Sequence, residues 1–89
     1  MKEYVYPALF RANADGSYTI TYPDLPGCVS EGKTITNAID MAQSALSQWI
    51  AYMEDKGLIL PPASAISDIS VKQDEFVRLI RSLNQKMRG

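Results

Sequence analysis

The alternation of apolar and polar residues predicts β-strands in the first quarter of the chain. Residues 4–11 are rich in apolar and β-forming side chains, and Pro7 within them indicates a position that need not donate a ladder hydrogen bond. Residues 13–17 form a turn cluster whose Asp-Gly pair suits a hairpin connection. Residues 18–22 then place Tyr, Ile and Tyr at every second position. The pattern predicts an antiparallel hairpin with one packed face and one face open to water.

Residues 22–34 join the end of a strand, a bend and the start of a helix. Pro23 and Pro26 bracket the bend, and residues 28–30 form a short third strand after it. Thr34 is suited to be a helix N-cap, because its hydroxyl can accept a hydrogen bond from the amide three residues later.

The segment after Thr34 has the strongest helical pattern in the chain. Apolar residues recur at three- and four-residue steps; they are Ile35, Ala38, Ile39, Ala42, Ala45, Leu46, Trp49, Ile50 and Met53. Polar residues are expected on the opposite face: Thr36, Asp40, Gln43, Ser47 and Glu54. Gly57 stands where a left-handed C-terminal cap belongs. We predict a helix of about 22 residues that packs on the sheet, with Trp49 and Met53 in the core rather than in a ligand site.

The last third of the chain is ambiguous by periodicity. Residues 58–67 contain two consecutive prolines and predict a return loop. Residues 75–87 fit both a helical stripe and a strand. Because a helix after antiparallel strands usually returns the chain to the sheet as a parallel strand through a right-handed crossover, we predict a strand at about 75–82.

Size and composition indicate one small cytoplasmic domain over residues 1–89. A chain of 89 residues buries roughly 60–65% of its unfolded surface, so oligomerisation would help it. No apolar run is long enough to span a bilayer. The single Cys28 cannot form an internal disulfide and is interpreted as a small buried apolar residue.

Several classes of chemistry are excluded by what the sequence lacks. It contains no histidine, which removes Ser-His and Cys-His nucleophile pairs and most transition-metal sites. It also lacks a glycine-rich phosphate loop. We therefore predict no catalytic residue, no cofactor and no metal. The net charge is −1, but residues 63–89 are basic; their cations are Lys72, Arg78, Arg81, Lys86 and Arg88.

The residues from Asp24 to Thr34, Asp-Leu-Pro-Gly-Cys-Val-Ser-Glu-Gly-Lys-Thr, resemble a segment of the HicB-type antitoxins of bacterial toxin–antitoxin pairs. Leu60-Pro61-Pro62-Ala63-Ser64 and residues 75–80 also match, so that the resemblance covers residues 4 to about 83. It implies an α+β, partial RNase H-like fold: a three-stranded antiparallel meander, one long helix covering one face, and a fourth strand beside the first. The implied sheet order is 3-2-1-4, in agreement with the predicted elements.

The resemblance also implies a non-enzymatic role, in which the domain binds and occludes a small HicA-like ribonuclease toxin. On this interpretation Tyr22 and Leu25 are apolar anchors for the toxin, since tyrosine is favoured in interface cores. Asp24 and Glu31 offer negative charge to a basic toxin surface. A homodimer or higher oligomer is expected, because an exposed third or fourth strand is an edge that a small sheet must cover.

Two other functions compete with this one. Longer family members carry a C-terminal DNA-binding module, which these 89 residues do not include, so DNA binding is not expected; a short nucleic-acid-binding transcriptional regulator using the basic tail is the alternative. A metal-dependent nuclease would need converging carboxylates, yet residues 4–10 hold none. The remaining acidic candidates stand in predicted turns and at the helix start: Asp15, Asp24, Glu31 and Asp40.

Overall fold

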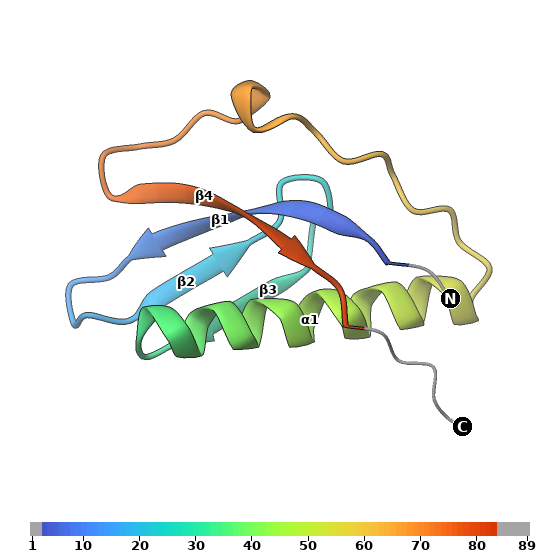
Figure 1. Ribbon diagram of the computed structural model, residues 1–89, viewed down its shortest axis with the longest axis horizontal. Coiled ribbons are helices and arrows are strands. Elements are labelled where there is room, and N and C mark those ends of the chain that lie inside the picture. Colours follow the sequence, from blue (N-terminus) through green and yellow to red (C-terminus); the bar gives the residue numbers. More distant parts are fainter. Residues whose placement is uncertain (1–2, 84–89) are drawn as a thin grey trace.

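The computed structural model describes residues 3–83, which form a four-stranded sheet covered on one face by a long helix (Figure 1). The elements in chain order are β1 (Val5–Ala12), β2 (Tyr18–Thr21), β3 (Val29–Gly32), α1 (Ile35–Asp55), the short 3₁₀ helix η1 (Ile66–Asp68) and β4 (Glu75–Arg81). The sheet order is β3-β2-β1-β4, and each neighbouring pair is antiparallel. The predicted α+β fold and strand order are therefore confirmed.

The sequence predicts the position of the fourth strand well, but the predicted direction, parallel to the first strand, is wrong. β4 runs antiparallel to β1, with Val5 opposite Arg81 and Arg11 opposite Glu75. The crossover rule assumes that the helix alone carries the chain back to the start of a new strand. Here the extended return segment, residues 58–74, first carries the chain back along the sheet and arches over β4 on the side away from α1 (Figure 1). The chain therefore enters β4 beside the end of β1.

The core lies between α1 and the sheet face that carries Phe10 and Ile20. Both of these side chains are fully buried, as are Ala38 and Ala42 on the facing side of the helix. The small alanines let the helix approach closely, as the sequence predicts. A Cβ added to Gly32 at the end of β3 would lie 2.3 Å from the Cα of Ala38, so the start of the helix touches the strand backbone.

Both ends of α1 match the sequence prediction. The hydroxyl of Thr34 accepts a hydrogen bond from the amide of Asn37 at 3.1 Å, and the Asn37 side chain in turn accepts one from the amide of Lys33 at 2.9 Å. Gly57 takes the left-handed conformation, with φ of 69°, and the amide of Leu58 bonds back to Met53. Within residues 3–83, neither helix is long and apolar enough to cross a membrane.

The predicted apolar stripe of α1 is only partly correct. Ile35 and Ile39 are each 38% exposed, because the band that contacts the sheet is narrow and follows Ala38, Ala42 and Leu46. Ser47, expected on the polar face, is only 2% exposed. Its hydroxyl donates to the carbonyl of Gln43 at 2.8 Å and accepts from the amide of Leu83 at 2.6 Å. The chain just after β4 covers this side of the helix.

Candidate protein-binding site

The bend between β2 and β3 is built around two side chains that point into the core. Tyr22 and Leu25 are each 2% exposed, and the Tyr22 hydroxyl donates to the carbonyl of Ala42 at 2.6 Å. The backbone turns twice, through bonds from the amide of Leu25 to the Tyr22 carbonyl and from the amide of Cys28 to the Leu25 carbonyl, each 2.9 Å. Tyr22 and Leu25 thus hold the bend against the helix. Their direct contact with a partner stays a prediction, and it would require the bend to open.

Asp24 connects the bend to the return segment. Its carboxylate accepts hydrogen bonds from the Ser64 amide at 2.9 Å and from the Ser64 hydroxyl at 2.5 Å. Close by, the hydroxyl of Tyr6 donates to the carbonyl of Pro61. Burial, and secondly the negative charge of Asp24, raise the pKa of Tyr6. Asp24 therefore fixes the return segment beside the bend and stays half-buried.

Glu31 is the predicted site residue whose side chain is exposed. It lies on β3 opposite Thr19, two positions after Val29, which is 56% exposed. Alternation along the strand directs both side chains to the sheet face that α1 does not cover. The structure thus brings together the bend and the carboxylate of Asp24, but places Glu31 on an adjacent open surface.

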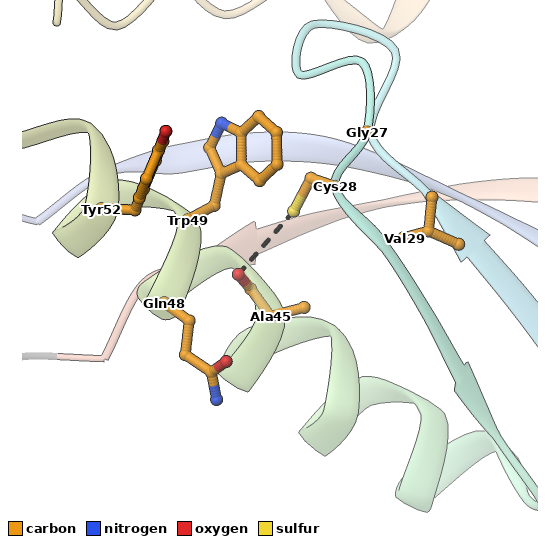
Figure 2. Close-up of a pocket in the computed structure, with 7 residues that line it drawn as sticks. All are labelled: Gly27, Cys28, Val29, Ala45, Gln48, Trp49 and Tyr52. Atoms are coloured by element: carbon orange, nitrogen blue, oxygen red, sulfur yellow. Dashed lines mark hydrogen bonds between the residues drawn. The ribbon is translucent and has the colours of Figure 1, made fainter. Parts of the chain in front are cut away.

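A pocket of about 460 Å³ lies between the bend and the fourth and fifth turns of α1 (Figure 2). Its lining residues are Gly27, Cys28, Val29, Ala45, Gln48, Trp49 and Tyr52. Figure 2 shows the Trp49 ring between Tyr52 and the corner at Gly27 and Cys28. Gly27 has φ of 101°, and a Cβ there would lie 3.1 Å from the Trp49 ring, so the glycine lets the bend approach the indole.

This pocket is absent from the sequence prediction, which assigns Trp49 to the core. Trp49 packs against the core and also stays half-exposed at the pocket wall. The available signal was the second aromatic residue, Tyr52, one helical turn later on the edge of the apolar stripe. Half-exposed Trp and Tyr side chains beside a bend are the residue types that anchor protein partners.

The thiol of Cys28 at the bend is buried and is not activated as a nucleophile. Cys28 is 3% exposed, its thiol lies 3.7 Å from the Ala45 carbonyl, and burial raises its pKa to about 11. A thiol with such a pKa is protonated at neutral pH and is a poor nucleophile. Residues 3–83 contain no cluster of three or more Cys, Asp or Glu side chains placed to hold a metal ion.

The basic residues of the alternative hypothesis do not form a single patch in the described part of the chain. Lys72 lies in the return segment, while Arg78 and Arg81 alternate to opposite faces of β4. The Arg78 guanidinium lies 4.8 Å from the centre of the Phe76 ring, and Arg81 forms a 3.7 Å ion pair with Glu3. Lys86 and Arg88 lie outside the described residues.

Fold and site together describe a small α+β domain with a pocket between its bend and its long helix. The model of a protein family described as the HicB-like antitoxin of bacterial toxin–antitoxin systems matches residues 6–85. The chain belongs to this family, whose members are non-enzymatic antitoxins. The resemblance inferred from the bend is thereby confirmed.

Two curated relatives agree with this membership. Antitoxin HicB of Escherichia coli K12 is 28% identical over 83 residues, covering 92% of this chain and 56% of the relative. An uncharacterised 14.9 kDa protein from the rep–hol intergenic region of Haemophilus phage HP1 is 33% identical over 72 residues, covering 81% of this chain and 53% of the relative. The chain thus spans about half the length of these relatives.

Solved structures share the fold. A chain of a toxin–antitoxin complex from Streptococcus pneumoniae superposes with a TM-score of 0.83 at 19% identity, covering 99% of this chain and 79% of that one. The N-terminal domain of antitoxin HicB from Burkholderia pseudomallei gives 0.75 at 22% identity, covering 91% and 99%. A chain of a HicA3–HicB3 toxin–antitoxin complex gives 0.68 at 23% identity, covering 86% and 95%.

Proposed function

We propose that this chain is an antitoxin domain that binds a small HicA-like ribonuclease toxin and occludes its active site. The observation that carries the proposal is the family match over residues 6–85. Two of the structures with the same fold come from toxin–antitoxin complexes, which supports a protein partner. Because the toxin acts on RNA, we place the complex in the cytoplasm. The reducing conditions there agree with the free thiol of Cys28.

The toxin-binding surface extends from the pocket across the outside of the bend to β3. Trp49, which packs against the core, and Tyr52 beside it supply apolar area, and aromatic side chains with two rotatable bonds lose little conformational entropy on binding. Glu31 and Asp24 supply negative charge at the rim, which accelerates association with a basic partner. Tyr22 and Leu25 contribute by keeping the bend in the shape that presents these groups.

The proposal is tested by measuring how this chain inhibits the cleavage of a labelled RNA by a HicA-like toxin, which is to be sought in the gene next to that of this chain. Trp49→Ala removes an apolar anchor, and Glu31→Lys reverses a charge at the rim. Each variant should therefore weaken inhibition about tenfold or more. Asp40→Lys is the matched control, because Asp40 is an exposed acid on the helix side turned away from the sheet. Equal inhibition by all three variants would exclude this surface.

A further inference from the structure

The outer edge of β4 has no strand beside it within residues 3–83. β4 is the last strand of the sheet and pairs only with β1. In Figure 1 β4 crosses in front of β1, and the chain that follows the strand passes in front of α1. An open edge of this kind presents unpaired amides and carbonyls to any strand that approaches it.

The register shows which backbone groups of β4 face outward. Backbone bonds join Ala12 to Asp74 and Ser82 to Tyr4 at the two ends of the β1–β4 ladder. Hydrogen-bonded pairs alternate along an antiparallel ladder, so the even-numbered residues of β4 turn their backbone groups toward β1. The odd-numbered residues, Glu75, Val77, Leu79 and Arg81, turn theirs away from it.

The ends of this edge are already bonded within the chain, and its centre is open. The amide of Glu75 donates to the Lys72 carbonyl at 3.0 Å, and the carbonyl of Arg81 accepts from the Gln43 side chain at 2.8 Å. At the centre, the Val77 carbonyl accepts a hydrogen bond from the neighbouring Arg78 guanidinium at 3.2 Å, and no other bond to it is found among residues 3–83. The side chain of Leu79, 56% exposed, lies on the uncovered sheet face.

We propose that β4 pairs with β4 of a second copy of this chain, antiparallel, about a two-fold axis that passes through Arg78. In this register Val77 lies opposite Leu79 of the second copy, and their outward amides and carbonyls form the narrow hydrogen-bonded pairs. Glu75 lies opposite Arg81 of the second copy, which gives one charge pair at each end. Two four-stranded sheets then become one continuous sheet.

The sequence of β4, Glu-Phe-Val-Arg-Leu-Ile-Arg, makes this register self-complementary. A two-fold axis perpendicular to the sheet pairs only residues of the same face, so alternative registers shift by two positions. An axis through Val77 sets Glu75 opposite Leu79, and an axis through Leu79 sets Val77 opposite Arg81. Each alternative loses the charge pairs, which selects the register centred on Arg78.

The other sheet edge fits a second copy less well. An axis through Ser30 of β3 sets Val29 opposite Glu31 of the second copy, an apolar residue against an acid. An axis through Glu31 sets two carboxylates opposite one another, which is destabilising. In the β4 pairing the like charges at the axis are the two Arg78 side chains, and each lies exposed over its own Phe76 ring.

The test is the self-association of the purified chain by sedimentation equilibrium, without any toxin, so its result is independent of the proposed function. The wild type should dimerise. Glu75→Arg and Arg81→Glu should each raise the dimer dissociation constant about tenfold or more, because each puts two like-charge pairs in the interface. Lys33→Glu, a charge reversal beyond the end of β3, is the matched control and should leave it unchanged.

The decisive arm mixes the two charge-reversed variants. A dimer of one Glu75→Arg copy with one Arg81→Glu copy regains opposite charges at both ends, so the mixture should associate as tightly as the wild type. The double variant should also dimerise, with a circular dichroism spectrum like that of the wild type. A monomeric wild type, or a dimer that is indifferent to these changes, would overturn the proposal.

Discussion

The close approach of α1 to β3 makes Gly32→Ala the most informative single change. The added Cβ would lie 2.3 Å from the Cα of Ala38, 2.4 Å from its amide nitrogen and 2.7 Å from its Cβ. Ordinary carbon–carbon contacts are about 3.5–4.0 Å, so the helix start and the strand must separate by roughly 1 Å. Two of the three atoms are backbone, and no side-chain rotation relieves the contact.

The sign of the change in unfolding free energy caused by Gly32→Ala shows whether this contact exists. Without a clash, Gly→Ala at a position of negative φ would stabilise the protein by about 0.4–1 kcal/mol, because the unfolded chain loses conformational freedom. Overpacking costs about 1–3 kcal/mol, and backbone overlap puts Gly32→Ala at the upper end of that range. For a domain whose unfolding free energy is roughly 4–13 kcal/mol, this is a large fraction.

Urea unfolding followed by far-ultraviolet circular dichroism measures the change directly. We expect Gly32→Ala to lower the unfolding free energy by about 2–3 kcal/mol and the melting temperature by about 8 °C or more. Gly16→Ala is the matched control: Gly16 has φ of 90° with no atom near a Cβ, so only the backbone strain of about 1–2 kcal/mol applies. Adding Ala38→Gly should not rescue Gly32→Ala, because the backbone contacts persist. A Gly32→Ala protein as stable as the wild type, or more stable, would refute the packing described here.

Four further predictions concern the bend and its supports. Tyr22→Phe removes the hydrogen bond to Ala42 and should cost about 0.5–1.5 kcal/mol in urea unfolding; an unchanged midpoint would contradict that bond. Cys28 should react with iodoacetamide at pH 8 at least about tenfold more slowly in the folded protein than in urea, because its pKa is raised to about 11. The raised pKa also favours the protonated thiol in the folded state. The contribution of this thiol to stability is therefore complete below its pKa in the unfolded chain and is lost as the pH rises toward 11. Stability that increases over this pH range would contradict the raised pKa. Asp24→Ala breaks two bonds to Ser64 and should expose the return segment to limited proteolysis, with Asp40→Ala as the control that leaves cleavage unchanged.

The elements that the sequence predicts well are those with local causes. α1 has a long apolar period, and its caps at Thr34 and Gly57 are side-chain or backbone properties of single residues. The direction of β4 is not local, since it depends on where the return segment delivers the chain. The burial of Ser47 is equally non-local, because it is produced by the chain at Leu83.

The candidate site is likewise predicted by the sequence only in part. Its location at the bend follows from the prolines, the glycine and the resemblance they carry. The sequence does not predict which side chains of the bend point inward, because a bend has no fixed period from which to assign faces. Tyr22 and Leu25 therefore prove to be core residues, while Trp49, assigned to the core, forms a pocket wall.

The central claim is that this chain occludes a ribonuclease. The most direct measurement is the rate at which a purified HicA-like toxin cleaves a labelled RNA, titrated with the purified wild-type chain. We expect cleavage to fall linearly to zero at equimolar chain, and the two proteins to co-purify and restore growth when co-expressed. Unchanged cleavage at about tenfold molar excess of the chain would contradict the claim.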